Sequence, residues 1–287
     1  MTAKSALMLR VLINRFHQGS PEILLSSLPQ ENAKEVLGID VASQDAAQAI
    51  HSPKEIVKEV HYSWFGPIIQ ACSPSMQPLM MSALPSSSAE QLSRFFQIPK
   101  HSTTLSPTVR LYLINQLYHK LKPADILPAG YLPQTSLSVL LSFRKEDLIK
   151  LIDFLGLYDL ADEIRHIVDK KLLNAIYSGL SVKKQHFLRI CLHQKGKLSM
   201  PRLDLEKWQG DNKQLDKMLH NRGLIRLGKA LSGQSNDFIW HIVHRLDTGR
   251  GNLLMRYYSS EEIQGVTQVL IQEVLNLTSF FKRMGES

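Results

Sequence analysis

The 287-residue chain is poor in cysteine, with only Cys72 and Cys191, so it can form at most one disulfide bond. A disulfide-stabilised scaffold is therefore excluded, and a reducing compartment is favoured. Aromatic residues amount to only 7%, but the apolar fraction of 44% and the charged fraction of 21% are those of an ordinary globular protein. Intrinsic disorder and collagen-like structure are excluded as well.

Long uncharged runs are also scarce. Residues 60–89 contain no Asp, Glu, Lys or Arg and would be long enough to span a membrane. Four prolines, seven serines and His61 interrupt this run, and each proline removes a backbone hydrogen-bond donor. We therefore expect several short, mostly buried helices here and no transmembrane segment.

The first 16 residues lack the unbroken apolar run of a signal peptide, because Arg10 interrupts it. An amphipathic surface helix fits this segment better. Its candidate contact residues are Leu7, Leu9, Val11, Leu12 and Ile13. With no export or membrane signal, we expect a soluble protein.

The chain carries a formal net charge of +8, and this excess is unevenly distributed. The first hundred residues hold 8 basic and 8 acidic side chains, whereas residues 181–250 hold 14 basic and 6 acidic ones. Such a basic segment attracts an acidic protein, nucleic acid or anionic lipid, or forms a solvated face. The candidate interaction surface consists of Lys183, Lys184, Arg189, Lys195, Lys197 and Arg202.

Apolar residues recur at helical spacing over most of the chain, which predicts a mostly α-helical fold. One helix is expected to begin after Asp159, as its N-cap, and to end at Gly179. The last helix is expected to begin at Ser259, because Glu262 follows at the spacing of a capping box.

Two proline-bounded segments, residues 97–107 and 122–133, are candidate linkers. They place the main domain boundary near residue 125. We expect an N-terminal helical domain over residues 1–125 and a C-terminal helical domain over residues 126–287, which contains the basic segment.

The sequence leaves two folds open for the C-terminal part. Residues 211–221 are typical of a helix ended by Gly223, after which residues 224–227 and 238–243 form a β-hairpin in one interpretation. Helix, helix and hairpin make a winged-helix pattern, which would favour nucleic-acid binding. In the other interpretation, Asp237 caps a further helix.

Residues 223–230 nearly match a phosphate-binding loop, with Gly228 and Lys229 at the expected spacing. Ala230 replaces the hydroxyl residue that would hold Mg²⁺, and bulky residues fill the loop, so nucleotide binding is not expected. Five histidines fall in the basic segment, but no carboxylate or cysteine pair completes a metal site. We expect no cofactor and no metal.

Asp247 belongs to two further catalytic patterns. Residues 247–249 match the Asp-Thr-Gly triplet of aspartic proteases, but that chemistry needs two such aspartates. Residues 244–247, His-Arg-Leu-Asp, resemble the catalytic loop of RluA-like pseudouridine synthases, which would make Asp247 the catalytic aspartate. Only 40 residues follow it, too few for most of that family's β-rich domain. RNA modification therefore remains an alternative, and we expect a protein that is not an enzyme.

An internal repeat recurs at an offset of 56 residues. Residues 23–29 followed by Ala33 align with residues 79–85 followed by Ala89, and a fainter third copy begins at Leu140. Each of the first two copies predicts a helix that ends before a proline and a second helix that begins just after it. Repeated hairpins bury their apolar faces against their neighbours. We therefore expect a fold of stacked helical hairpins.

These phrases resemble known bacterial proteins. Residues 24–29, with Ala33 and residues 36–37, resemble the opening L-L-x-S-L-P-x-x-x-A-x-x-V-L of the flagellar switch protein FliG. Residues 61–69 and 77–85 resemble the SctK family, whose members are FliG-like accessory proteins of type III secretion systems. The charged motor helix of FliG has no match here, which favours the SctK family.

The resemblance implies a FliG- or armadillo-like arrangement of helices and a non-enzymatic role. The chain would be an adaptor of the cytoplasmic sorting platform, at the cytoplasmic face of the bacterial inner membrane. It would link an SctD-like inner-membrane ring protein to an SctQ-like pod protein, and nucleic acid would not be a partner.

Overall fold

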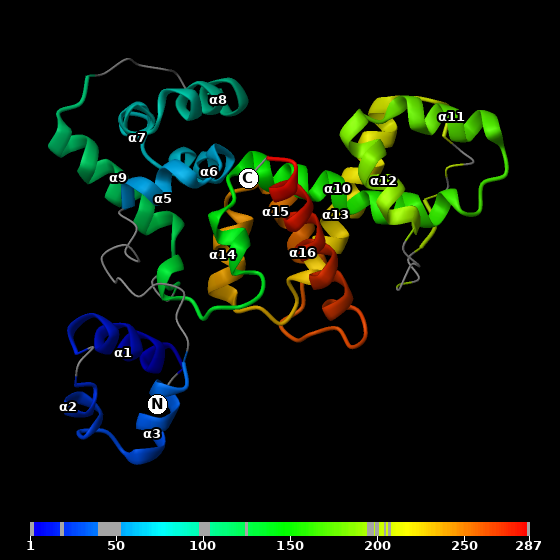
Figure 1. The fold of residues 1–287 in the computed structure, drawn as a ribbon. Helices are drawn as coiled ribbons and strands as arrows, with labels where there is room; N and C mark the ends of the chain where they lie inside the picture. The colour runs from blue at the N-terminus through cyan, green and yellow to red at the C-terminus, as the bar shows by residue number, and fades with distance from the viewer. Residues whose placement is uncertain are drawn as a thin grey trace. The chain divides into compact units, whose positions relative to one another are not determined.

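The computed structural model of the chain describes residues 3–17, 20–39, 53–97, 104–123, 126–193, 198, 201–203, 205 and 208–285. Over these residues the fold is all-α and contains no strand, which confirms the predicted helical fold class (Figure 1). None of the described helices is both long and apolar enough to cross a membrane.

The chain forms two compact units, and both are discontinuous in sequence. The first comprises Met1–Ser142 and Ser235–Thr248, and the second comprises Phe143–Gln234 and Gly249–Ser287. This division differs from the expected domains, residues 1–125 and 126–287. The expected boundary near residue 125 did not include the return of residues 235–248 to the first unit.

The helices of the first unit are mostly short, as expected for the uncharged run. They are α1 (Ala3–Phe16), α2 (Glu22–Leu25), α3 (Gln30–Leu37), α5 (Pro53–Glu59), η1 (Tyr62–Trp64), α6 (Phe65–Gln70), α7 (Gln77–Ala83), α8 (Ser86–Phe96), α9 (Pro107–Leu121), η2 (Ala129–Tyr131), η3 (Ser138–Ser142) and α14 (Asn236–Val243).

The first two copies of the internal repeat fold alike. In one, Pro29 joins α2 to α3; in the other, Pro85 joins α7 to α8. Both prolines cap the second helix with the same backbone dihedrals, φ −55° and ψ 142°. The amides of Ala33 and Ala89 donate to the carbonyls of these prolines over 3.0 Å in each case. Proline fixes φ near this value, so one sequence phrase makes the same turn twice. The faint third copy at Leu140 lies instead in the 3₁₀ turn η3.

Each hairpin packs into its own apolar core. The α2–α3 hairpin packs on α1, where Ala6, Ile13 and Val36 meet. The α7–α8 hairpin packs with α5, α6 and α9 around a larger cluster that contains Leu92 and Leu117. Val36 and Leu92 occupy equivalent repeat positions, and both are completely buried. The two copies therefore share a buried position as well as the same turn.

A segment from late in the sequence completes the first unit. Trp240 of α14 packs into the same core as α9. The Asp237 carboxylate accepts a hydrogen bond from the amide of Leu127 over 3.0 Å. Arg245 donates to the Glu59 carboxylate over 2.8 Å. Residues 235–248 are thus an integral part of this unit.

The second unit centres on two long helices, α10 (Lys145–Ile164) and α13 (Asn212–Ala230), which pack against each other. Glycines bring their backbones close. A Cβ at Gly223 would lie 1.7 Å from the carbonyl oxygen of Ile152, and one at Gly156 would lie 2.1 Å from that of Leu219. The other helices are α11 (Lys170–Gly179), α12 (Val182–His193), α15 (Thr248–Tyr257) and α16 (Thr267–Arg283).

Two predicted helix starts are wrong. Asp159 does not cap a helix; it lies inside α10, where Arg226 pairs with its carboxylate, and Asp169 caps the next helix instead. Ser259 does not begin the last helix: residues 259–266 form bends and turns, Gly265 has a φ of +71°, and α16 starts at Thr267. In both cases the apolar spacing predicted one continuous helix across residues that are not helical, 165–169 in the first and 259–266 in the second.

The predicted β-hairpin is also wrong. Residues 224–227 lie inside α13 and residues 238–243 lie inside α14, so the winged-helix interpretation is lost. Gly223 does not end its helix but lies inside α13. Its lack of a side chain allows the backbone of α10 to approach closely. The alternative helix does form, but its N-cap is Ser235, and Asp237 lies in its first turn.

Candidate functional site

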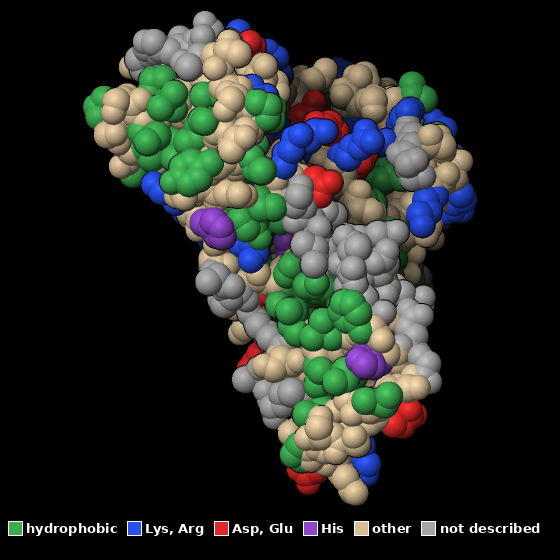
Figure 2. All heavy atoms as spheres, turned by 90° about the vertical axis from the view of Figure 1, so that its left-hand side faces the viewer, with side chains coloured by type: hydrophobic (Ala, Val, Ile, Leu, Met, Phe, Trp, Pro, Cys, Tyr) green, Lys and Arg blue, Asp and Glu red, His purple; other side chains and the backbone are tan. Residues whose placement is uncertain are grey.

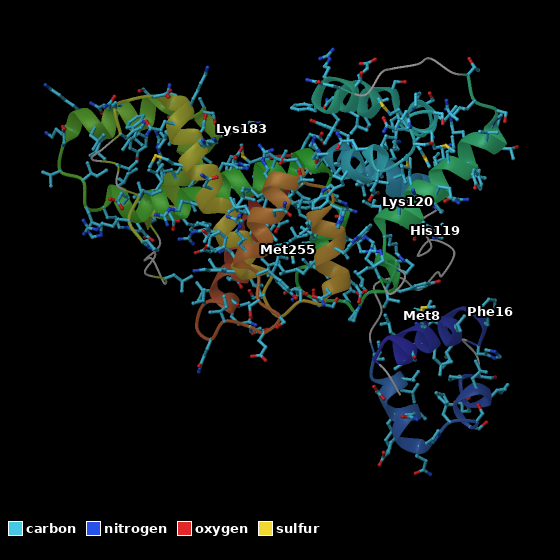
Figure 3. All side chains as sticks on the ribbon, turned by 180° about the vertical axis from the view of Figure 1, so that it is seen from behind. Met8, Phe16, His119, Lys120, Lys183 and Met255 are labelled. Carbon is cyan, nitrogen blue, oxygen red and sulfur yellow. The ribbon has the colours of Figure 1, made fainter. Side chains whose placement is uncertain are left out.

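The described part of the predicted interaction surface lies mainly on α12. Lys183 (labelled in Figure 3) and Arg189 are exposed. His186 and His193 are exposed as well, and their spacing places all four residues on one side of the helix. We call Lys183, His186, Arg189 and His193 the α12 basic face.

The other predicted residues do not join this face. Lys184 is an ion-pair partner of Asp216 over 2.8 Å, so its charge is already paired within the unit. Arg202 is exposed, and its carbonyl accepts a hydrogen bond from Arg222 over 2.6 Å. Lys195 and Lys197 lie outside the described residues.

Lys150 of α10 borders the α12 basic face, although it lies outside the basic segment of the sequence. Burial lowers the pKa of Lys150, and the neighbouring charge of Lys183 lowers it further. The Lys150 ammonium lies 4.7 Å from the centroid of the Phe281 ring, and the His186 ring stacks on Phe280 at 5.8 Å. The aromatic end of α16 therefore contacts both side chains, and the Lys150 ammonium over the Phe281 ring is a favourable cation–π arrangement.

Part of the basic segment is internal and cannot contact a partner. Arg226 is 1% exposed and pairs with Asp159 and Glu273. Cys191 is likewise buried, and burial raises the pKa of its thiol to about 12. A thiol held protonated in this way is a poor nucleophile.

The residues that resemble a phosphate loop serve helix packing. Gly223 contacts the α10 backbone, and a Cβ at Gly228 would lie 2.8 Å from the carbonyl oxygen of Leu254 in α15. Both glycines lie inside α13, where backbone amides donate to carbonyls of the preceding turn. Those amides cannot wrap a phosphate as a glycine-rich loop does.

The His-Arg-Leu-Asp phrase closes the late segment of the first unit. The His244 ring lies between Trp64 and Trp240, with centroid distances of 4.4 Å and 4.3 Å, and its Nδ1 donates to the Trp240 carbonyl. Burial lowers the pKa of His244 to about 4. Asp247 is half buried, and it adds to burial in raising the pKa of Tyr62. The described residues contain no strand for the β-rich domain that the RluA resemblance implies.

Metal ligands do not gather in the described part of the chain, where no group of three His, Cys, Asp or Glu side chains is placed to hold an ion.

Comparison with protein-family models, with curated proteins and with solved structures found no significant match.

Proposed function

We propose that the chain is a non-enzymatic adaptor of the cytoplasmic sorting platform of a bacterial type III secretion system. It links an SctD-like inner-membrane ring protein to an SctQ-like pod protein, and its hairpins present broad helical surfaces to both. The setting rests on the sequence resemblance to the SctK family.

The observation that carries the proposal is the paired hairpin. Pro29 and Pro85 stand 56 residues apart with the same dihedrals, and the equivalent residues Val36 and Leu92 are both buried. A repeated hairpin supports a scaffold role, because modules of this kind present extended surfaces to protein partners.

The α12 basic face gives the adaptor an electrostatic docking surface. Lys183 and Arg189 are exposed there, and Lys150 adds a third cation at its border. Complementary charge speeds association and selects partners. Salt screens this electrostatic attraction at exposed sites. An acidic surface on the ring or pod protein fits this face.

Co-expression with the ring and pod proteins of the same bacterium tests the proposal. Size-exclusion chromatography should show both partners eluting with the chain. The double variant Lys183→Glu, Arg189→Glu should weaken one of the two complexes, most strongly at low salt. The matched control Lys170→Glu, Lys171→Glu reverses two exposed charges on α11 and should leave both complexes intact. Elution of the chain without either partner would refute the assignment.

Nucleic-acid binding is the second candidate, and the α12 basic face is the feature that favours it. The available charge is smaller than the sequence suggests, since Arg226 and Lys184 are paired inside the unit. If this function holds, affinity for duplex or single-stranded oligonucleotides should fall steeply with salt. Absence of binding at low salt would remove this candidate.

A further inference from the structure

A thiol and an amine from separate parts of the sequence meet in the first unit. The Nζ of Lys120, in the last turn of α9, lies 3.7 Å from the Sγ of Cys72, which stands just after α6. Cys72 is half-buried, Lys120 is exposed, and their contact lies at the surface. Lys120 is labelled in Figure 3. We call these two residues the Cys72–Lys120 pair.

The packing of α6 on α9 holds the pair together. The amide of Cys72 donates to the carbonyl of Ile69 over 3.0 Å, and the side-chain amide of Gln77 donates to the Cys72 carbonyl over 3.1 Å. Leu117, three residues before Lys120, is buried in the same core as Ile69. The backbones on both sides of the contact are therefore fixed by one core.

Both reactive groups are open to reagents. The Lys120 ammonium has no carboxylate within ion-pair distance among the residues that the structure describes. The other cysteine of the chain, Cys191, is buried, and burial raises the pKa of its thiol to about 12. Cys72 is therefore the accessible thiol of this chain, and it has an amine beside it.

A thiol and an amine at this distance have complementary reactivity towards a thioester. The cysteine thiolate is a strong nucleophile that forms covalent acyl intermediates. A lysine amine then converts such a thioester into a stable amide. Groups about to react lie about 3–3.5 Å apart, and a carbonyl carbon one bond away from Sγ can come this close to the Lys120 Nζ. Held in this way, the amine acts as if it were highly concentrated.

The surroundings of the pair suit an anionic thioester with an apolar chain. α9 contains Arg110 and Lys120 but no acidic residue, so it attracts phosphate groups. Met76, in the turn that follows Cys72, is 37% exposed. Figure 2 shows further hydrophobic side chains on the surface in the upper part of the view, where α7, α8 and α9 lie. Thioesters of coenzyme A combine phosphates with an apolar acyl chain.

We propose that the Cys72–Lys120 pair is an acyl-transfer site, at which a thioester of the coenzyme A type modifies Lys120 by way of Cys72. The modification does not depend on the adaptor role. It leaves the side chain of Lys120 as an uncharged amide.

The transfer takes two steps. First, the Cys72 thiol loses its proton to water and its sulfur attacks the carbonyl carbon of the thioester. A carbon–sulfur bond to Cys72 forms, the bond to the carrier sulfur breaks, and the carrier leaves as a thiolate that takes up a proton. Second, the neutral amine of Lys120 attacks the same carbon. The carbon–nitrogen bond forms, the bond to Cys72 breaks, and the amine proton passes to the Cys72 sulfur, so the thiol is regenerated.

Incubation of the intact chain with acetyl coenzyme A tests the proposal. The reaction runs at about pH 8, where a small fraction of an ordinary lysine is neutral, and peptide mass spectrometry follows each lysine. Lys120 should be acetylated about tenfold faster or more than Lys171, an exposed lysine of α11 in the second unit, whose one cysteine is buried. Cys72→Ser should reduce the rate at Lys120 to that at Lys171, because an unassisted hydroxyl is a weak nucleophile. The rate at Lys171 should stay unchanged.

Lys120→Arg isolates the first step, because arginine keeps the positive charge but does not accept the acyl group. An acetyl thioester should then accumulate on Cys72, and hydroxylamine should remove it. Cys191 should stay unmodified, and circular dichroism should show both variants folded. Equal rates at Lys120 and Lys171, unchanged acetylation of Lys120 in Cys72→Ser, or no thioester in Lys120→Arg would each overturn the proposal.

Discussion

Arg226 of α13 donates a hydrogen bond from Nε to the carboxylate of Asp159 in α10 over 2.9 Å, and the two residues are only 1% and 4% exposed. Glu273 of α16 is a second partner of the same guanidinium. Burial lowers the pKa of Arg226, but Glu273 and Asp159 outweigh burial and hold the group charged. Three helices of the second unit therefore meet at one buried charge.

Removal of this charge should destabilise the second unit strongly. Arg226→Met leaves Glu273 without this cation and Asp159 with only Arg222, whose Nε lies 3.8 Å from the carboxylate. Loss of one partner from a buried pair costs about 3–5 kcal/mol. Urea denaturation measures the free energy of unfolding. The control Lys217→Met changes an exposed cation on the same helix and should stay within about 0.5 kcal/mol of the parent protein.

A compensated variant separates the charge from its packing. Arg226→Met combined with Asp159→Leu and Glu273→Leu removes all three charges, and it should recover much of the lost stability because apolar side chains can replace a buried ion network. A triple variant less stable than Arg226→Met would show that the packing of these residues matters more than their charge.

Gly223→Ala should force α10 and α13 apart. The new methyl group would lie 1.7 Å from a backbone oxygen of Ile152, which cannot move away as a side chain can. We expect a loss of about 1–3 kcal/mol or more by urea denaturation. Gly38→Ala is the control, because the nearest atom to its Cβ is 3.5 Å away, and it should be nearly neutral. Equal effects at both glycines would contradict this packing.

The paired hairpins predict paired responses to the same substitution. Both prolines have a φ of −55°, which their rings favour, so they restrict the unfolded chain without straining the folded one. Pro29→Ala and Pro85→Ala should therefore each reduce stability by about 0.4–1 kcal/mol, because alanine gives the unfolded chain more conformational freedom. The two residues belong to separate cores, so the losses should add in the double variant. A severe loss at one proline and none at the other would show that the hairpins are not equivalent.

His244 should make the stability of the first unit depend on pH. Its pKa falls from an ordinary 6.5 to about 4 on folding, so between these values the unfolded chain binds a proton that the folded chain rejects. Its contribution is complete above pH 6.5 and is lost as pH falls towards 4, with a limiting slope of about 1.4 kcal/mol per unit.

The measurement is urea denaturation across this range in the parent protein and in His244→Phe. The slope should be shallower in the variant, while His119→Phe, at an exposed residue of α9 (labelled in Figure 3), should keep the parent slope. Parallel pH profiles for His244→Phe and the parent would show that this histidine does not control the effect.

The repeat and the helical class were predictable because they depend on local rules. The residue before a proline avoids the helical conformation, so a helix break is expected before Pro29 and Pro85 whatever packs around them. The predicted helix end at Gly223 is wrong for the opposite reason. A glycine ends a helix or admits a neighbouring backbone, and only the position of α10 decides between these uses.

The candidate surface was predictable only in part, because a count of charges cannot tell which of them are paired. Lys183 and Arg189 are exposed as expected, but Lys184 and Arg226 are held by carboxylates from other helices. Lys150 was missed because its own stretch of sequence has no excess charge. Each of these outcomes depends on which helices pack together, which periodicity along one segment does not report.

The return of residues 235–248 to the first unit governs the order of events on the ribosome. A nascent chain that has emerged only as far as residue 142 lacks Trp240 and cannot complete the core around α9. Translation at about 5–20 residues per second delays that completion by roughly 5–20 s. The part of the first unit before residue 143 must therefore wait, with its core incomplete, while residues 143–234 of the second unit are synthesised.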